Sequence, residues 1–506
     1  MAFVVSPEAM RQYDVRCIKR EKISAYELME RAGSALADAI VDGGHMNTVR
    51  PSRVLVVSGP GNNGGDGLVV GRILAERGAD VTCAIIKGDD ATDENRRAQS
   101  ALSKSAASVV TLDSDSAMQR LFETTYDLII DALFGLGLDR VPEGLFANAI
   151  RQMNASTATR VALDIPSGLH GGTGLAFVPC VHAHVTLVVE AFKHGNLMHD
   201  ARDVSGDIIL VSIGIDCTGS KERFITSESL HNQVPLRRHH SHKYHHGTVQ
   251  IVGGAYEMPG APALTARAAY AVGAGLVILS TSSSVRAVLR DIPSEAIHAT
   301  IPEHGTPVMD RADAYVIGPG LLNSPANEVT MEAMLARPTP MVIDGGALGM
   351  FHERFMMAPD KPVVLTPHAG EMASLCQLST KDFTQNWHHH VSQYATQHGV
   401  YVLYKGPCSV LVSPDGTIRY MLSGNPALAK AGSGDVLAGI IGTFLAQGMP
   451  AKTAVPLAVY IHGHAADLAA QAHGELSVMA HDVIRLLSDA LKPFVTQKER
   501  ATISIR

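Results

Sequence analysis

The stretch 429–435, AKAGSGD, combines a glycine-rich turn with an acidic side chain at its end. The residues that follow it, VLAGIIGTFLAQG, have apolar side chains at helical spacing, which predicts a buried helix that begins at the glycines. The free N–H groups and the dipole of such a helix favour an anion at its N-terminus. Asp435 stands at that point, where a carboxylate either caps the helix or accepts a proton from a substrate hydroxyl. A capped helix after a tight turn is the purely structural alternative.

A second glycine-rich stretch, GPGNNGGDG at 59–67, follows the apolar run RVLVVS and precedes another helical pattern. Its small residues predict a close approach of the backbone to a phosphate at the start of a helix. The spacing matches neither GxGxxG nor the phosphate-loop motif GxxxxGK[ST]. The Asn and Asp oxygens could instead bind a cation, and a purely structural turn is the third alternative.

Polar residues follow several apolar runs in the first half of the chain. Asp131 precedes ALFGLGL, and Asp164 precedes IPSG. Because the carboxyl ends of parallel strands meet at one edge of a sheet, we expect Asn63, Asp131 and Ser167 to converge on a small cation. Asp164 is expected to meet a ligand hydroxyl or amide, and Lys193 is the nearest basic candidate. Each of these residues taken alone is more often a solvated loop residue.

Apolar runs of strand length recur at the intervals typical of α/β proteins. In the first half they lie at 53–58, 80–87, 126–132, 160–165, 185–191 and 208–213, after a helical region at 6–41. In the second half they lie at 248–253, 275–281, 313–317, 340–344, 362–366 and 400–405, before a hairpin at 408–421 and three closing helices. Such runs are typical of parallel strands buried on both faces, so the pattern predicts α/β domains. Gly320, His368, Lys405 and Asp435 fall at strand-to-helix junctions and are expected to share one cleft.

Composition restricts the class of protein. With 506 residues, 46% of them apolar and 18% charged, the chain is long enough for two or more domains with cores of their own. The net charge of −7 argues against nucleic acid as the main partner. Six cysteines without a CxxC motif argue against a disulfide framework or a zinc ribbon and favour a reducing compartment. We find no signal peptide and no uninterrupted apolar run of about 20 residues, so we expect a cytoplasmic protein without a membrane partner.

The pattern of strands and helices lapses between residues 217 and 246. We place the domain boundary there, with domains at 1–225 and 226–506. Five histidines lie at the end of this segment, at 239, 240, 242, 245 and 246. A metal site is one interpretation, but no second group of ligands follows, so the spacing favours a solvated basic segment.

The motifs GNNGGDG, DALFGLG, DIPSG and ARDVSGDIILVSIGID, in this order, resemble the NAD(P)HX epimerase domain of the bifunctional NAD(P)H-hydrate repair enzymes, the YjeF family. The similarity covers residues 6–218 and implies a Rossmann-like α/β sandwich. By this resemblance Asp164 contacts the reacting ring, and we infer Lys193 as its catalytic partner. A potassium ion is implied at Asn63, Asp131 and Ser167. The residues implied to bind the hydrated nucleotide are Asn62, Asn63, Gly64, Gly65, Asp66, Gly135, Leu136, Gly137, Leu138, Asp139, Arg140 and Val141.

In the second half the ordered motifs GGAYEMPGAPALTARAAYAVGAGL, GPG, DGGAL, TPHAGE, KGPCS and AGSGDVLAGIIG resemble the ADP-dependent NAD(P)HX dehydratases, which have a ribokinase-like α/β fold. The similarity covers residues 235–495 and implies that Ala261, Gly320 and His368 contact the hydrated nicotinamide nucleotide. Asp435 is implied to act on the hydroxyl that is phosphorylated. The residues implied to bind the adenine nucleotide are Lys405, Gly406, Pro407, Cys408, Ser409 and Gly434. The family loop is usually KGxxT, and the change to Pro-Cys-Ser keeps a hydroxyl but alters the turn.

Together the two resemblances imply a bifunctional repair enzyme. It would interconvert the R and S epimers of NADHX and NADPHX and dehydrate the S epimer to NAD(P)H at the expense of ADP, yielding AMP and phosphate. Potassium is implied at the epimerase site and magnesium with ADP, and a homo-oligomer is expected. Two alternatives stay open. The second half could be a small-molecule kinase of the ribokinase-like fold, and the first half a nucleotide-binding module without turnover.

Overall fold

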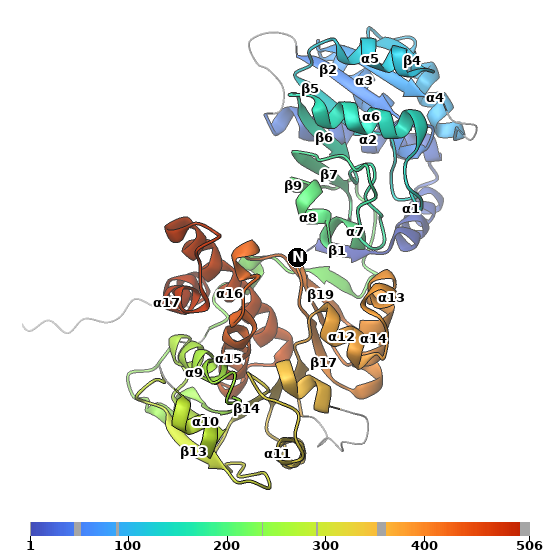
Figure 1. Ribbon diagram of the computed structural model, residues 1–506. Helices are drawn as coiled ribbons and strands as arrows, with labels where there is room; N and C mark the ends of the chain where they lie inside the picture. The colour runs from blue at the N-terminus through green and yellow to red at the C-terminus, as the bar shows by residue number, and fades with distance from the viewer. Residues whose placement is uncertain are drawn as a thin grey trace, which may run out of the picture. The chain divides into compact units, whose positions relative to one another are not determined.

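The computed structural model describes residues 2–44, 52–87, 91–234, 236–289, 292–351 and 361–495. The chain divides into two compact units, Ala2–Arg223 and Phe224–Arg506, and Figure 1 shows the elements of each. Within the described ranges, no helix combines the length and the apolar character that crossing a membrane requires.

The first unit is built on seven parallel strands in the order β4-β3-β2-β5-β6-β7-β9. Their bounds are β2 (Arg53–Ser58), β3 (Asp80–Ile86), β4 (Ser108–Leu112), β5 (Leu128–Ala132), β6 (Thr159–Leu163), β7 (Val185–Val189) and β9 (Asp207–Val211). Two short strands, β1 (Ala2–Val5) and β8 (Phe192–Lys193), pair in parallel. The six strands expected from the sequence are confirmed. We did not expect β4, because its side chains are mostly exposed and form no continuous apolar run.

Helices cover both faces of this sheet. The helices of the unit are α1 (Pro7–Glu21), α2 (Ala25–Asp42), α3 (Asn62–Glu76), α4 (Asp93–Leu102), α5 (Asp115–Phe122), α6 (Gly144–Ala155), α7 (His194–Leu197) and α8 (Ala201–Val204). Alternate side chains of β2 enter different cores: Val54 and Val56 pack with α2, α3 and α4, while Leu55 and Val57 pack with α5 and α6. The sheet is therefore the middle layer of an α/β sandwich.

The second unit contains the strand order β13-β12-β11-β14-β15-β16-β17-β18-β19. The strands from β13 to β17 are parallel, and β17, β18 and β19 pair antiparallel through hairpins. Their bounds are β11 (Thr248–Val252), β12 (Leu276–Ser282), β13 (Ile297–Ile301), β14 (Ala314–Ile317), β15 (Met341–Ile343), β16 (Val363–Leu365), β17 (Tyr401–Tyr404), β18 (Ser409–Val412) and β19 (Ile418–Met421). β10 (Glu222–Phe224) spans the division between the units. We did not expect β13, which is largely half-exposed.

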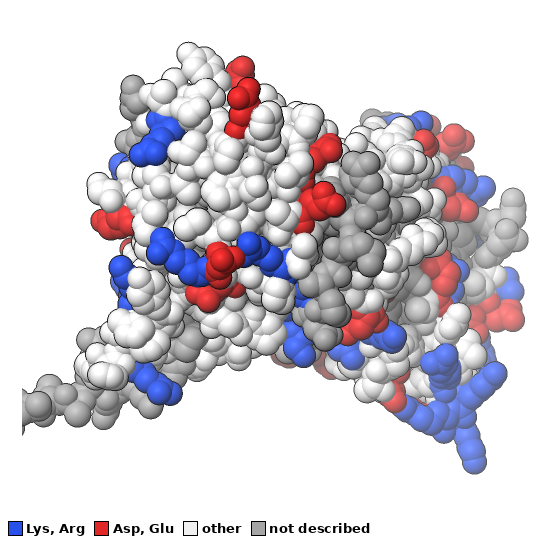
Figure 2. All heavy atoms as spheres, turned by 90° about the horizontal axis from the view of Figure 1, so that it is seen from below, with Lys and Arg blue, Asp and Glu red and all other residues white. Residues whose placement is uncertain are grey.

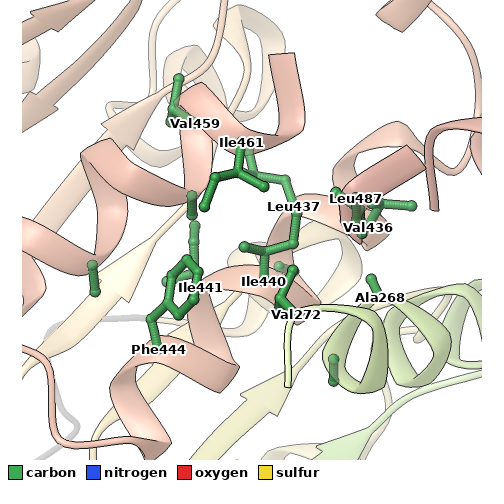
Figure 3. Packing of buried hydrophobic residues seen from close by; sticks show 14 of the residues in the cluster. Ala268, Val272, Val436, Leu437, Ile440, Ile441, Phe444, Val459, Ile461 and Leu487 are labelled. Atoms are coloured by element: carbon green, nitrogen blue, oxygen red, sulfur yellow. The ribbon is translucent and has the colours of Figure 1, made fainter. Parts of the chain in front are cut away.

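The helices of the second unit are α9 (Gly260–Ala271), α10 (Ser283–Val288), α11 (Pro325–Leu335), α12 (Ala369–Leu375), α13 (Thr380–Gln385), α14 (Trp387–His398), α15 (Ser433–Ala446), α16 (Ala451–His473) and α17 (Ala480–Leu491). Short 3-10 turns lie at Ser227–Leu230, Lys243–His246, Gly345–Met350, Pro426–Leu428 and Lys492–Phe494. The expected helix after the AKAGSGD stretch is α15, and it is buried along most of its length. In Figure 3, Ile440 and Phe444 of α15 lie in one core with Ala268 of α9, Ile461 of α16 and Leu487 of α17.

The surface carries charges of both signs. On the face drawn in Figure 2, acidic and basic side chains lie in small groups among uncharged residues. All six cysteines are free thiols, and five of them are buried. Of the five clustered histidines, His239, His240, His242 and His245 are exposed, which agrees with the interpretation of this segment as solvated.

Candidate active sites

The glycine-rich stretch of the first unit forms the beginning of α3. We expected Asn62 and Asp66 in a loop, and this expectation is wrong, because the helix already begins at Asn62. The glycines allow tight packing rather than an unusual backbone: a Cβ at Gly64 would lie 2.0 Å from the carbonyl oxygen of Gly59. Asn63 and Gly65 lie in the same first turn. The free N–H groups of this turn can therefore face an anion at the carboxyl edge of the sheet.

The seven residues at 135–141 form the segment after β5. A Cβ at Gly135 would lie 3.0 Å from the Cβ of Asn63, so this glycine packs directly on the first turn of α3. Leu136 lines a cavity, and Leu138 is buried. The members exposed at the surface are Gly137, Asp139, Arg140 and Val141.

Asp131, at the end of β5, is fully buried. Its two carboxylate oxygens accept hydrogen bonds from the Ser167 hydroxyl at 2.6 Å and from the Ser167 N–H at 2.7 Å. The Asn63 amide donates to the Phe134 carbonyl at 2.8 Å, and the Phe134 N–H donates to the Ser167 hydroxyl at 2.9 Å. Burial raises the pKa of Asp131 to about 6, although the bonds from Ser167 oppose the rise. The fold thus brings together the three residues expected at a cation, all with hard oxygen donors.

Asp164, which follows β6, has a φ of +64°, in a left-handed region that Asp and Asn tolerate better than most residues. Its carboxylate accepts a hydrogen bond from Lys193 Nζ at 2.5 Å and another from the Val189 N–H at 3.1 Å. Lys193 is 1% exposed, and its ammonium also donates to the Val189 carbonyl at 2.9 Å. Lys193 and Asp164 therefore form a largely buried ion pair.

This ion pair lines a cavity of about 180 Å³. Asp14 of α1 and Asp66 of α3 line the same cavity. Burial raises the pKa of Asp14 to about 6. Burial, together with the charges of Asp164 and Asp14, raises the pKa of Asp66 well above its usual range. Among the residues that line the cavity, Lys193 is the one cation, so several carboxyl groups surround a single ammonium.

In the second unit, Gly432 is the N-cap of α15 with a φ of +92°, where a Cβ would lie 2.7 Å from Leu264 Cδ1. Only glycine meets both conditions without strain. Asp435 lies in the first turn of the helix, and within the described part of the chain its carboxylate has neither a hydrogen bond nor an ion pair. Burial raises the pKa of Asp435 to about 6; the charge of Asp344 adds to this rise and that of Lys405 opposes it. A carboxylate of this kind is suited to accept a proton near neutral pH.

Lys405, directly after β17, brings a positive charge to the N-terminus of α15. Its ammonium lies 3.0 Å from an oxygen of Asp344 and 3.9 Å from an oxygen of Glu371. Burial opposes the charge on Lys405, but the two carboxylates more than offset it and raise its pKa. Asp344 also accepts a hydrogen bond from the Thr366 hydroxyl at 2.6 Å. A Cβ at Gly434 would lie 3.4 Å from Lys405 Nζ, so a glycine there lets the ammonium approach the helix.

The three residues expected to contact the hydrated nucleotide lie at two places. Ala261 is in the first turn of α9, and a Cβ at Gly320 would lie 2.9 Å from the Ala261 Cβ. His368 caps α12, where its Nδ1 accepts hydrogen bonds from two backbone N–H groups of the following turn, and its side chain is 61% exposed. A parallel bridge places His368 beside Lys405. Ala261 and Gly320 therefore form one pair, and His368 and Lys405 form another.

The loop expected to bind the adenine nucleotide connects β17 and β18. Gly406 and Pro407 are exposed, whereas Cys408 is fully buried. The Cys408 thiol points to the Ser409 carbonyl at 3.9 Å, so this residue can offer a nucleotide only its backbone. Ser409 begins β18 and is half-exposed, so its hydroxyl is the polar side chain of the loop after Lys405.

Both units match known families. Residues 25–195 match the family model of the YjeF-related protein N-terminus, and residues 249–489 match that of NAD(P)H-hydrate dehydratase. A bifunctional NAD(P)H-hydrate repair enzyme from Moorella thermoacetica is 33% identical over 513 residues, which cover 97% of this chain and 97% of that protein. This chain belongs to the family of bifunctional NAD(P)H-hydrate repair enzymes.

Other members of the repair enzyme family are similarly distant. The Escherichia coli enzyme is 32% identical and aligns with 96% of this chain and 94% of its own length. Among solved structures, the ADP/ATP-dependent NAD(P)H-hydrate dehydratase from Bacillus subtilis, co-crystallised with ATP and Mg²⁺, is 30% identical. It covers 54% of this chain and 98% of its own, with a TM-score of 0.49.

Sequence reasoning missed four residues of this repair enzyme that the fold brings to the two sites. Asp14 lies at the first cavity, and Asp344 and Glu371 lie at the ammonium of Lys405. His462 of α16 is buried with its Nε2 3.4 Å from the Ser433 hydroxyl; burial and then Lys405 lower its pKa to about 4. A sequence signal existed for Asp344, which directly follows β15, and for Glu371, three residues after a helix cap.

Proposed function

We propose that the unit Ala2–Arg223 interconverts the R and S epimers of NAD(P)HX, and that the unit Phe224–Arg506 dehydrates the S epimer to NAD(P)H with ADP as phosphoryl donor. One observation supports this division of labour most directly. Each unit gathers, by itself, a half-buried aspartate, a lysine and a helix N-terminus preceded by glycine near the ends of its parallel strands. Each site therefore has the groups for both phosphate binding and proton transfer.

Dehydration needs a better leaving group than hydroxide. Asp435 accepts the proton of the substrate hydroxyl while the hydroxyl oxygen attacks the β-phosphoryl group of ADP, and AMP leaves. The N–H groups of α15 and the Lys405 ammonium stabilise the charge on the transferred group. The electron pair of the ring nitrogen then expels phosphate, and loss of a proton from the neighbouring ring carbon restores the double bond of NAD(P)H. Magnesium bound with ADP would offset the charge of its phosphates.

Epimerisation inverts the ring carbon that carries the hydroxyl and is bonded to the ring nitrogen. When the hydroxyl on this carbon is protonated, the nitrogen electrons can expel it as water, and water can return to either face. Asp164, held by Lys193, is placed to accept the proton of the returning water. The oxygen donors of Asn63, Asp131 and Ser167 suit potassium chemically, and the ion would supply a fixed positive charge beside the buried carboxylate of Asp131.

We also propose that the enzyme works in the reducing cytoplasm, because all six of its cysteines are free thiols. The rival kinase function would leave a stable phosphate ester. The observation that favours dehydration over this alternative is the match of residues 249–489 to the NAD(P)H-hydrate dehydratase family model.

The test is the recovery of the near-ultraviolet absorbance of NADH from a mixed-epimer preparation of NADHX, with the full chain, magnesium and either ADP or ATP. We expect a fast phase as the S epimer is consumed and a second phase, faster than spontaneous epimerisation, as the R epimer follows. Asp164→Ala should remove only the second phase. Recovery that stops when the S epimer is exhausted in the wild type would contradict the epimerase assignment. Accumulation of a phosphorylated product in place of NADH would contradict the dehydratase.

A further inference from the structure

Asp14 places a carboxyl group in the middle of an apolar stripe of α1. Met10, Asp14 and Ile18 are four residues apart, so they share one helix face, and all three line the cavity of the first unit. Within the ranges that the structure describes, the Asp14 side chain has no hydrogen bond and no ion pair. A half-buried polar group without a partner costs free energy, so packing alone does not account for an acid at this position.

Burial affects the protonation of Asp14 more strongly than the charges around the cavity do. The Lys193 ammonium is engaged by Asp164 and by the Val189 carbonyl, so it is not paired with Asp14. Burial raises the pKa of Asp14 to about 6; Lys193 opposes this rise and the charge of Asp164 adds to it. A group of this kind gives and takes protons readily near neutral pH.

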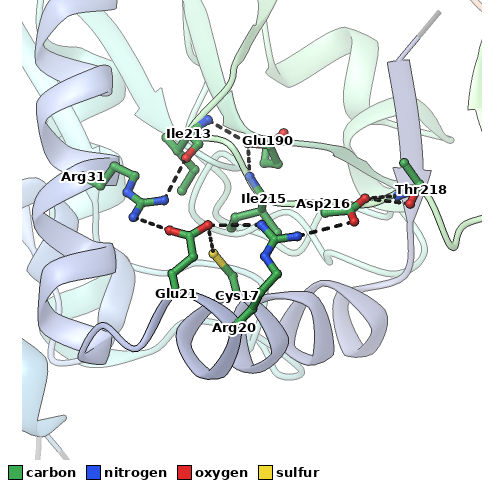
Figure 4. Close-up of polar contacts among 9 residues, drawn as sticks. All are labelled: Cys17, Arg20, Glu21, Arg31, Glu190, Ile213, Ile215, Asp216 and Thr218. Carbon is green, nitrogen blue, oxygen red and sulfur yellow. Dashed lines mark hydrogen bonds and ion pairs between the residues drawn. The ribbon is translucent and has the colours of Figure 1, made fainter.

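Hydrogen bonds and ion pairs anchor the C-terminal end of helix α1 (Figure 4). At its C-terminal end, Glu21 accepts hydrogen bonds from Arg20 at 3.1 Å and from Arg31 of α2 at 2.7 Å. Arg31 also donates to the Ile213 carbonyl at 3.3 Å, and Arg20 reaches Asp216 at 3.4 Å. These contacts tie α1 to α2 and to the segment after β9, which fixes the face that carries Asp14.

We propose that Asp14 is a further catalytic residue of the epimerisation, the acid that protonates the leaving hydroxyl while the Asp164 carboxylate accepts the proton of the returning water. This inference rests on the proposed epimerase function. The carbon–oxygen bond breaks with both electrons on oxygen, which takes the Asp14 proton and leaves as water, while the ring nitrogen's electron pair forms a carbon–nitrogen double bond. Water then adds to the opposite face of this cation and gives its proton to Asp164. Proton exchange with solvent restores both groups, and the reverse reaction exchanges their roles.

Asp14→Asn tests the proposal because it keeps the size of the side chain and removes its acidic proton. In the full chain with magnesium and ADP, we expect the R-epimer phase to slow by about a hundredfold, the usual effect of losing a general acid. The KM for the R epimer and the S-epimer phase, which belongs to the other unit, should stay unchanged. The matched control is Asp42→Asn, an exposed acid at the end of α2, which should alter neither phase.

The pH profile separates a catalytic role from a structural one. The wild-type epimerisation rate should fall as the pH rises through the pKa of Asp14, about 6, because only the protonated carboxyl is an acid. This limb should be absent in Asp14→Asn and present again, at partial activity, in Asp14→Glu. The other titratable groups that line the cavity, all of which the variants keep, are Asp66, Glu94, Asp164 and Lys193. Besides burial, the charge of Asp14 raises the pKa of Asp66 and of Cys217, so Asp14→Asn should lower both, whereas Asp14→Glu keeps this charge.

An R-epimer phase and a pH limb that are unchanged in Asp14→Asn would overturn the role of Asp14. A structural role is indicated instead if Asp14→Asn and Asp14→Glu lose the R-epimer rate equally, raise the KM and keep the wild-type pH profile. That result would also overturn the catalytic role of Asp14. A wild-type enzyme that shows no R-epimer phase would instead overturn the proposed epimerase function itself, so the two failures are distinguishable.

Discussion

At the scale of single residues, the two aspartates assigned to chemistry differ in their partners. Asp164 has its own ammonium, because Lys193 lies 2.5 Å from its carboxylate. Asp435 has no paired ammonium, because the Lys405 ammonium pairs with Asp344 at 3.0 Å instead. Asp164 therefore acts together with a cation, whereas Asp435 is free to take a proton from a substrate while the neighbouring lysine stabilises phosphate.

We predict that dehydration of the S epimer requires Asp435 in its deprotonated form. Its pKa is about 6, so the rate should rise with pH through this value and reach a plateau above it. Asp344 raises the pKa of Asp435, so Asp344→Asn should move this acidic limb to lower pH. The measurement is the initial S-epimer rate at saturating ADP across the pH range.

Two variants complete this test. Asp435→Asn should lower the plateau at least about a hundredfold, as expected for a lost general base. Glu475→Gln, at an exposed acid of the same unit, should leave the profile in place. A limb at the same pH in Asp344→Asn as in the wild type would contradict the assignment of this limb to Asp435.

At the scale of elements, α3 illustrates how glycines position a helix N-terminus. Gly64 lies where a Cβ would be 2.0 Å from a backbone oxygen, and Gly67 where it would be 2.4 Å from the Cβ of Ala132 on β5. Both neighbours are rigid. The glycines therefore let α3 approach the sheet closely enough to bring Asn63 to the Asp131 cluster.

We predict that Gly64→Ala destabilises the first unit by about 1–3 kcal/mol, the usual cost of inserting a methyl group into a packed site. It should also slow the R-epimer phase, because α3 must shift. Gly61→Ala is the matched control: no atom lies within 4 Å of a Cβ there, and its φ is negative. It should cost less than about 1 kcal/mol. Denaturant unfolding of the full chain measures both, and equal losses in the two variants would contradict this explanation.

At the scale of the whole molecule, the two units have separate hydrophobic cores. The cores of the first unit are formed by residues between Val5 and Cys217, and the large core of the second by residues between Ile225 and Phe494. Each proposed site is built from residues of its own unit. The two reactions can therefore proceed independently, with the S epimer passing through solution.

This independence predicts that two variant chains, each inactive at a different site, complement each other. Asp164→Asn alone should convert only the S epimer, and Asp435→Asn alone should yield almost no NADH. An equimolar mixture of the two variants should recover the absorbance of both epimers, at a rate limited by the concentration of each active unit. A mixture that stops when the S epimer is exhausted would indicate that both sites must lie on one chain.

Much of this architecture was predictable from short stretches of sequence. Continuous apolar runs predicted twelve of the strands, because strands of a covered parallel sheet bury both faces. β4 and β13 escaped this signal because they are largely exposed. We expected α3 to begin after the glycine stretch 59–67, but it begins at Asn62, because the close packing of its glycines cannot be read from the sequence.

The order of motifs along the chain by itself determined the family, and it predicts which residues lie near each site. Tertiary structure decided which side chains are in contact. Lys193 was inferred from the sequence as the partner of Asp164 and meets it across 29 positions, whereas the pairing of Lys405 with Asp344 across 61 positions had no signal in the sequence. The sequence likewise does not indicate the burial that raises the pKa of Asp14 and Asp435 to about 6. Burial and charge pairing depend on which elements meet in space, and a one-dimensional pattern does not contain those distances.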